Sequence, residues 1–277
     1  MKKVKPTTLR PPRENIALEK DYAKRLIKLT TDIGKSFLYW TLATVNKNAN
    51  KNISKQLVFN FNELLKEWNK KTSDFAKKEA KRTTKQVSSF VNGNLQNQSP
   101  EFALKRSVKE IDNTLNAVYE RNYNLIKTIP QDIKERFESV FLNNVNNFDQ
   151  EAIFKQVETI NGISKRRART IARDQVQKAI GEYHATREQA LGFEYYMWMT
   201  SKDERVSTGK GGHRQLEGRI YRYDTPSAVI DSYGNIGVPS QRVNCRCRRK
   251  AVILKPNQEV KLISDGASGD YYIIVEK

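Results

Sequence analysis

Cysteine, histidine and long apolar runs are all scarce in this sequence. Of its 277 residues only two are cysteines and two are histidines. Cys245 and Cys247 are so close in sequence that a bridge between them would be strained, which excludes a disulfide scaffold. The most apolar stretch, residues 36–45, is only ten residues long, whereas a membrane-spanning helix needs about 20. We therefore expect no disulfide framework and no membrane partner.

The N-terminal residues lack the apolar core of a signal sequence. Lys2, Lys3 and Lys5 are basic, but residues 6–13 are polar and rich in proline. Residues 1–15 hold three of the eight prolines and show no apolar periodicity. The sequence therefore predicts a disordered basic arm over residues 1–15, on a protein kept in the cytoplasm or packed into an assembly made there.

Acidic residues are too few to balance the basic ones. Fifty lysines and arginines stand against 31 aspartates and glutamates, a formal net charge of +19. Such an excess attracts polyanions, of which DNA and RNA are better candidates than an anionic membrane. The hydrophobic fraction of 38% is nevertheless sufficient for real cores, so the chain should fold.

Residues 16–160 are predicted to be an elongated helical region. Apolar residues recur at spacings of 3 and 4 over residues 22–45, 61–91 and 104–129, and Pro130 is expected to end the third helix. Two shorter helices should follow, around residues 133–142 and 149–160. The lysine- and asparagine-rich residues 46–52 and the residues 92–100 are interpreted as connections.

From residue 161 the pattern predicts a compact domain that reaches residue 255. A helix is expected to open after Gly162 and to stop at Gly192. Alternating residues then predict strands at 193–199, 219–223 and 248–254, and residues 256–277 a further strand or hairpin as a tail. The predicted fold class is α+β: an elongated N-terminal helical region followed by one helix with a small antiparallel sheet.

Within this segment five pieces occur in a fixed order. They are ARTIARDQ (168–175), ALGFEYYMW (190–198), TSKDERV (200–206), HRQLEGRIY (213–221) and VNCRCRRKAV (243–252). In these pieces the chain resembles the phage Mu F-like head morphogenesis domain. The resemblance covers about a third of the chain, and NCRC is its most specific element.

The resemblance implies a minor capsid protein of a tailed bacteriophage. Such a protein would act in head assembly at the portal vertex, in the virion or in the host cytoplasm during assembly. Its expected partners are the portal protein, the major capsid or scaffolding protein, and packaged double-stranded DNA. The long amphipathic helices of residues 16–160, with lysine-rich outer faces, are expected to carry the protein contacts.

The resemblance also places a histidine near the two cysteines. His213, Cys245 and Cys247 offer one nitrogen and two sulfurs for zinc, with Asp203 as a possible fourth ligand. The chain departs from its relatives by a glycine-rich insertion at residues 207–212, and it lacks the extra cysteines of zinc-binding relatives. A metal-free arrangement is the open alternative: two half-buried thiols would then lie beside a hydrogen-bonded histidine. His184, in mid-helix, is expected to be structural or solvated.

Two basic groups are candidates for DNA contact. Residues 241–255 hold six basic residues and no acidic one, among them Arg242, Arg246, Arg248, Arg249 and Lys250. A second group, Arg166, Arg169 and Arg173, shares one face of the predicted helix. A solvated helix face is the alternative for the second group. We expect binding without sequence preference, because no recognition motif is present.

An enzyme is not the expected function, and no catalytic residues are assigned. The sequence lacks H-E-x-x-H, G-x-S-x-G and an ordered Ser-His-Asp set, and residues 209–212 fail the pattern of a phosphate-binding loop. A metal-dependent nuclease remains an alternative, which could use the carboxylates of Asp203, Glu204, Glu217 and Asp224 with His213. A phage-delivered effector is a further alternative, although few residues remain after Lys255 for a separate catalytic domain.

Overall fold

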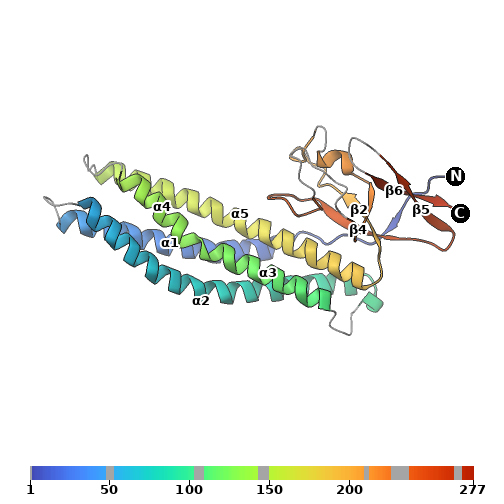
Figure 1. Ribbon diagram of the computed structural model, residues 1–277, viewed down its shortest axis with the longest axis horizontal. Helices are drawn as coiled ribbons and strands as arrows, with labels where there is room; N and C mark the ends of the chain where they lie inside the picture. Colours follow the sequence, from blue (N-terminus) through green and yellow to red (C-terminus); the bar gives the residue numbers. More distant parts are fainter. Residues whose placement is uncertain are drawn as a thin grey trace. The chain divides into compact units, whose positions relative to one another are not determined.

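The computed structural model describes residues 2–47, 53–102, 109–142, 150–208, 212–225, 237–264 and 270–277. The α-helices of these described residues are α1 (Ile16–Lys47), α2 (Ile53–Gln96), α3 (Lys109–Lys127), α4 (Ile129–Leu142) and α5 (Gln150–Ala190) (Figure 1). Two short 3-10 helices are η1 (Pro100–Phe102) and η2 (His213–Leu216). The strands within the described ranges are β1 (Thr7–Thr8), β2 (Tyr195–Met199), β3 (Ile220–Arg222), β4 (Arg248–Ile253), β5 (Gln258–Ile263) and β6 (Tyr271–Glu276). The predicted α+β class is confirmed.

The helices follow the predicted periodicity but not all of the predicted ends. Two helices were expected on either side of Gly162, yet α5 runs unbroken through it. A glycine inside a helix costs about 1 kcal/mol, which the buried residues of the same helix offset. Pro130 is the second residue of α4, where its missing N–H has no helical partner to lose. The predicted helix residues Leu104 and Val108 lie outside the described residues.

The chain forms two compact units that do not follow the boundaries predicted at residues 160 and 255. The bundle unit comprises residues 16–84 and 117–175, and the sheet unit comprises residues 1–15, 85–116 and 176–277. Helices α2, α3 and α5 each contribute residues to both units. A pattern of apolar residues along the chain shows where a helix forms but not which unit each of its turns joins.

The bundle unit is held by an aromatic core and by a few buried polar pairs. Phe37 of α1 lies against Phe61 of α2 and Phe137 of α4, with ring centroids 5.2 and 5.4 Å apart. The Tyr22 hydroxyl donates to Asn122 Oδ1 at 3.0 Å, and both residues are fully buried. Burial of such rings stabilises the unit by roughly 1.5–3 kcal/mol each.

The sheet unit contains one six-stranded sheet in the order β1-β4-β2-β3-β6-β5, with antiparallel pairing throughout. One face holds Tyr196, Trp198 and Tyr221, which cluster with Ala185 near the end of α5. The opposite face holds a second cluster built on Tyr195, Ile220, Val252 and Ile274. Because both faces carry apolar clusters, the strands pack a core on each side.

The N-terminal segment was predicted to be a disordered arm, and this prediction is wrong for residues 2–9. Thr7 and Thr8 pair with Ile253 and Val252 of β4, and Lys3, which precedes β1, forms an isolated bridge with Val275 of β6. Val4 donates its N–H to the Ile274 carbonyl at 2.9 Å and packs against the second apolar cluster. The composition of the segment does not predict this pairing, because backbone hydrogen bonds to an existing sheet need no apolar periodicity.

The predicted C-terminal hairpin is present, but as part of the sheet. β5 pairs with β6 over six residue pairs, and β6 pairs with β3 through Ile220 and Tyr272. The tail expected over residues 256–277 therefore completes the domain expected to end at residue 255. Ile274 and Val275 of β6 are almost fully buried.

Candidate metal centre

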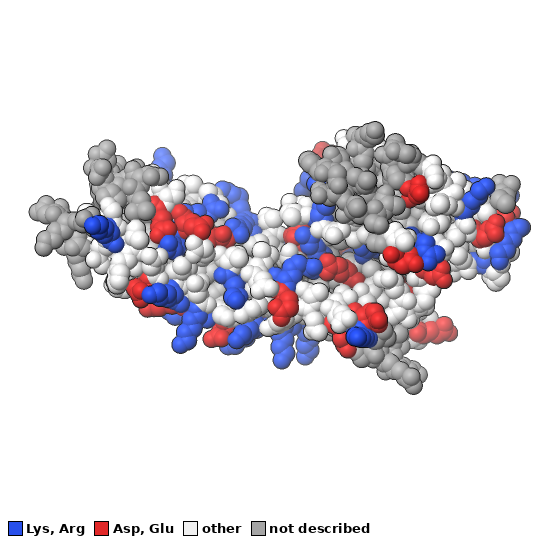
Figure 2. Space-filling view, in the orientation of Figure 1, with Lys and Arg blue, Asp and Glu red and all other residues white. Residues whose placement is uncertain are grey.

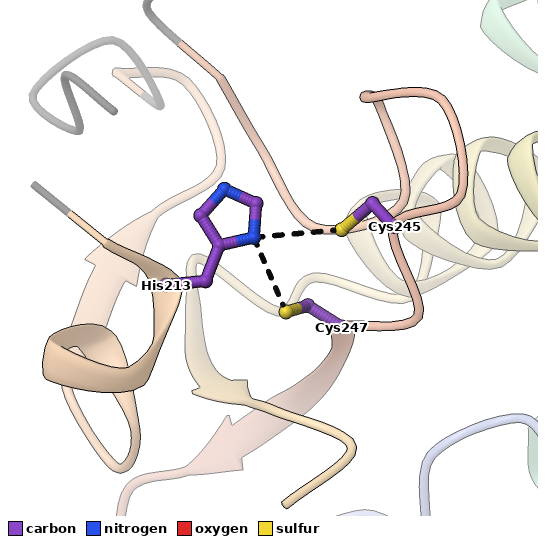
Figure 3. A group of neighbouring side chains, drawn as sticks. All are labelled: His213, Cys245 and Cys247. Carbon is purple, nitrogen blue, oxygen red and sulfur yellow. Dashed lines mark hydrogen bonds between the residues drawn. The ribbon is translucent and has the colours of Figure 1, made fainter. Parts of the chain in front are cut away.

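Three side chains from two distant chain segments converge in the sheet unit. His213 opens η2, and Cys245 and Cys247 precede β4 (Figure 3). His213 Nδ1 lies 3.7 Å from Cys245 Sγ and 3.5 Å from Cys247 Sγ. Their potential ligand atoms all lie within 4.8 Å of one another. Among the described residues this is the one group of three or more His, Cys, Asp or Glu side chains with metal-binding spacing.

The cysteine segment is shaped by two residues in the left-handed region. Asn244 has φ of 63° and Ser240 has φ of 70°. Asparagine tolerates this conformation better than most residues, and the resulting turn lets Cys245 N–H donate to the Arg242 carbonyl at 3.0 Å. Ser240 Oγ donates to the Cys247 carbonyl at 2.8 Å. The turn thereby fixes both ends of the Cys-x-Cys stretch.

The same segment docks on α5 at a glycine. A Cβ atom on Gly181 would lie 2.8 Å from Ser240 Cβ, closer than real side chains approach. Arg249 Nη1 donates to the Gly181 carbonyl at 2.9 Å from the following strand. Gly181 is therefore required by the close approach of the cysteine segment to the helix.

His213 is held by the ends of the insertion. Ser207 Oγ accepts a hydrogen bond from His213 N–H at 2.9 Å, and the Ser207 carbonyl accepts one from Arg214 N–H at 3.1 Å. A Cβ atom on Gly212 would lie 2.6 Å from the Ser207 carbonyl oxygen, so the turn needs a glycine there. The His213 ring packs edge-on against Trp198, with centroids 5.2 Å apart. Residues 209–211 of the insertion lie outside the described part.

The two thiols share a proton unequally. A hydrogen bond from the Cys247 thiol lowers the pKa of Cys245, against the effect of burial, and the neighbouring His213 lowers it further. The same hydrogen bond, with burial, raises the pKa of Cys247. The pair therefore presents one thiolate readily, and a bound cation would favour loss of the second proton.

The donor set and its size fit a zinc ion. Tetrahedral zinc with Zn–S of about 2.3 Å and Zn–N of about 2.0 Å places neighbouring S and N ligands roughly 3.5 Å apart. The observed Nδ1···Sγ distances of 3.5 and 3.7 Å are of this size. His213 and Cys247 are buried and Cys245 is half-buried. Three such donors form one face of a tetrahedron and leave its fourth corner to another ligand.

Asp203, the expected fourth ligand, is not in this group. Its carboxylate forms an ion pair with Arg246 and accepts from Arg205 N–H at 3.1 Å. Desolvation opposes the ionisation of Asp203, but the hydrogen bond and charge of Arg246 outweigh it and lower the pKa. Among the described residues the group of potential ligands therefore consists of His213, Cys245 and Cys247 without Asp203.

The carboxylates considered for a nuclease centre do not join the group either. Glu217 accepts hydrogen bonds from Thr200 N–H at 2.6 Å and Thr200 Oγ1 at 2.7 Å. Asp224 forms a two-pronged hydrogen bond with Arg222, which lowers its pKa. His184, the second histidine, is buried 3.2 Å from the Glu188 carboxylate. Each of these groups has its own partner within the sheet unit.

The basic run at residues 241–255 is largely used inside the sheet unit. Arg246 pairs with Asp203, and Arg248 pairs with Glu14 at 3.2 Å. Arg249 is 9% exposed and lies over the Tyr196 ring. Arg242 and Lys250 are half-buried. In the bundle unit, by contrast, Arg166, Arg169 and Arg173 of α5 are all exposed, so this stripe is accessible to solvent.

The three candidate ligands were predicted from the sequence, but the residues that position them were not. Two segments are held in place by serine hydroxyls that bond to the backbone, by close approach at glycines and by one left-handed asparagine. The residues are Ser207, Gly212, Ser240, Asn244 and Gly181. Glycine and asparagine within a predicted loop were the available signals, but their partners depend on chain segments far away in sequence.

The comparisons with known proteins agree with the sequence resemblance. The model of one family, described as Phage Mu protein F like protein, matches residues 138–250, which include all three candidate ligands. The chain is 30% identical over 182 residues to an uncharacterized protein of Haemophilus influenzae, and the match covers 62% of this chain and 37% of the relative. No solved structure matches the chain. In the described residues no helix has the length and apolarity of a membrane span. Over residues 138–250 the chain is similar to the family of phage Mu protein F like proteins.

Proposed function

We propose that the protein is a minor head protein of a tailed bacteriophage, acting in head assembly at the portal vertex. The family match over residues 138–250 is the observation that carries this proposal. The chain spans 37% of the length of the Haemophilus influenzae relative, so its partners are inferred from the chemistry of its own surfaces. The portal protein and the major capsid or scaffolding protein are the proposed protein partners.

Double-stranded DNA is the proposed nucleic-acid partner. The formal charge of +19 favours contact with phosphates, and Figure 2 shows lysine and arginine side chains scattered over the visible face among acidic ones. The exposed stripe of Arg166, Arg169 and Arg173 is the first proposed contact. The run from Arg242 to Lys250 is the second, although several of its charges also have partners within the fold.

We further propose that the metal centre holds a structural zinc ion through His213, Cys245 and Cys247. Bound there, zinc would link η2 to the segment before β4, two stretches far apart in sequence. We propose an architectural role because three of the four carboxylates considered for catalysis have other partners. Glu217 is bonded to Thr200, Asp224 to Arg222 and Asp203 to Arg246. The protein would then have no catalytic residues.

The assembly role is tested in particles. A phage or prophage that encodes this protein is induced with the gene intact or disrupted, and DNA-filled heads are purified after nuclease treatment. We expect the protein in intact heads in few copies, and no infectious heads without it. Co-expression of the full chain with the portal protein should yield a complex. Normal infectivity of the disrupted phage, or absence of the protein from heads, would contradict the proposal.

A further inference from the structure

The six-stranded sheet has one long open edge. β5 (Gln258–Ile263) is the last strand in the sheet order and pairs only with β6 among the described residues. The opposite edge is β1, which has two residues and offers almost no ladder. Unpaired N–H and C=O groups along a six-residue edge are a ready template for another strand. The edge is therefore a candidate interaction surface.

The side chains on β5 combine an exposed apolar residue with two exposed charges of opposite sign. Leu262 is 48% exposed, and it lies on the same face of the strand as Val260, which packs against the apolar cluster of Tyr195 and Ile274. Glu259 and Lys261 are exposed on the other face, and neither has an ion-pair partner among the described residues. Charges on an edge oppose pairing with most strands, so a partner strand must place an opposite charge against each of them.

The sequence of β5 is complementary to itself. When two copies pair antiparallel with Val260 opposite Val260 of the second copy, Glu259 lies opposite Lys261 on both sides of the centre. Leu262 then lies opposite Gln258 and diagonal to Val260 of the second copy, and becomes less exposed. Both charged residues gain a partner of opposite sign.

Neighbouring registers are disfavoured for identifiable reasons. A shift by one position places the apolar face of one sheet beside the charged face of the other, because side chains alternate along a strand. The next shifts that preserve the faces place Glu259 opposite Glu259, or Lys261 opposite Lys261. Like charges directly opposite one another are unfavourable. Charge thus selects one register.

We propose that two copies of this chain associate through β5, in an antiparallel register centred on Val260, to form a continuous sheet. The interface is small, so the association is expected to be weak and reversible. It depends on backbone pairing and on two symmetric Glu259–Lys261 contacts, and it should weaken as salt rises. It requires neither DNA nor metal, and it goes beyond the proposed assembly role.

Charge exchange tests the proposal with the full-length chain. Sedimentation equilibrium over a wide concentration range should show a monomer–dimer equilibrium for the wild type. E259K or K261E should weaken it about tenfold, because each replaces two favourable cross-strand contacts by two repulsive ones. The double variant E259K/K261E should dimerise like the wild type. An equimolar mixture of the two single variants should also form dimers, since each chain then carries the complement of the other.

A crosslinking experiment tests the register. Under mild oxidation V260C should form a disulfide-linked dimer, because residue 260 lies opposite itself, whereas K261C lies opposite Glu259 and should not. Cys245 and Cys247 are present in both variants and serve as a common background. Thermal melts of each variant show whether it folds as the wild type does. A wild type that stays monomeric up to its solubility limit, single variants that dimerise normally, or a mixture that fails to recover would each overturn the proposal.

Discussion

At the scale of single residues, the candidate metal centre depends on where three donor atoms point. His213 Nδ1 faces both sulfurs at 3.5 and 3.7 Å, although 32 positions separate the histidine from Cys245. Asp203 has the chemistry of a ligand but belongs to an ion pair with Arg246. Side-chain direction therefore separates the ligand set from a nearby carboxylate of similar chemistry.

The zinc content of variants distinguishes the proposed metal ligands from Asp203. Protein purified without chelator should contain about one zinc per chain by elemental analysis. C245S and C247S should lose the metal, whereas D203N should keep it. With free zinc about a hundredfold above its dissociation constant, the ion stabilises by about 2.7 kcal/mol, so chelation should lower the melting temperature by roughly 5–10 °C. If the wild type contains no zinc, C245S is expected to cost only on the order of 1 kcal/mol.

Glu217 is a second residue whose environment can be tested, because its lowered pKa should make the stability of the fold depend on pH. Partial burial opposes its ionisation, but hydrogen bonds from Thr200 and Lys202 outweigh this and lower its pKa. A carboxyl group with a lowered folded-state pKa stabilises the fold above its unfolded value, and this contribution is lost as pH falls through the folded-state value. The relevant window therefore lies below the ordinary value of 4.5.

Unfolding free energies in urea, measured with chelator from about pH 3 to about pH 7, test this assignment. The difference between wild type and E217Q should be largest at neutral pH and should shrink as pH falls below the ordinary glutamate value. Chelator removes the separate acid dependence of metal ligands. An unchanged difference across the whole range would show that Glu217 contributes no ionisation-linked stability.

At the scale of elements, α5 contains two glycines that differ in whether the surrounding structure has space for a side chain. Gly162 lies in the bundle unit, where an added Cβ would meet only Arg166 Nη1 at 3.9 Å. Gly181 lies in the sheet unit, where the added atom would lie 2.8 Å from Ser240 Cβ. The same helix therefore tolerates a side chain at one glycine and excludes it at the other.

Paired alanine substitutions exploit this contrast. G162A should stabilise the protein by up to about 1 kcal/mol, because alanine loses less conformational entropy in a helix. G181A should destabilise it by about 1–3 kcal/mol, because the cysteine segment must move away from the helix. Thermal or urea unfolding measures both, and each variant is the helix-propensity control for the other. Similar gains in both variants would mean that Ser240 does not contact α5 at Gly181.

At the scale of the whole molecule, the positive charge is the property with the widest consequence. Arginines near β4 form ion pairs or are buried, and in the bundle unit Arg25 and Arg167 are also ion-paired. Arg166, Arg169 and Arg173 have exposed side chains on α5. Buried and paired charges contribute to the fold, and exposed ones to contacts with polyanions. The helix stripe is therefore the part of the surface on which the proposed DNA contact is tested first.

DNA affinity measured against salt concentration tests that contact. The wild type should bind duplexes of unrelated sequence equally, with affinity falling steeply as salt rises. Changing Arg166, Arg169 and Arg173 to glutamine should reduce the slope of log K against log salt by about 2.7, because each phosphate that is no longer neutralised accounts for about 0.9. A matched variant with Lys66 and Lys71, which pair with Glu63 and Glu67, changed to glutamine should alter the slope less.

The same titration distinguishes other outcomes. An unchanged slope in the triple arginine variant would move the DNA contact elsewhere, with the run from Arg242 to Lys250 as the next candidate. Cutting of plasmid DNA in the presence of Mg²⁺ or Mn²⁺ would contradict a non-enzymatic role and favour the nuclease alternative. A mobility shift without cutting is the expected result.

The sequence by itself determined the local elements and the chemistry available to them. Periodicity of 3.6 residues predicted the helices, alternation predicted the strands of the sheet unit, and the ordered pieces from ARTIARDQ to NCRC predicted the family. His213, Cys245 and Cys247 were also identified from sequence. These properties depend on residue type and near-neighbour spacing, which are written directly in the chain.

Only the tertiary structure decided which groups meet. Residues 2–9 pair with the sheet, and α5 continues through Gly162. Asp203 forms an ion pair with Arg246 and does not join the candidate metal centre. In the described part of the chain the tertiary structure also left β5 with β6 as its one strand neighbour. Each outcome depends on contacts between segments far apart in sequence, where backbone hydrogen bonds, close approach at glycine and the direction of a side chain outweigh local preference.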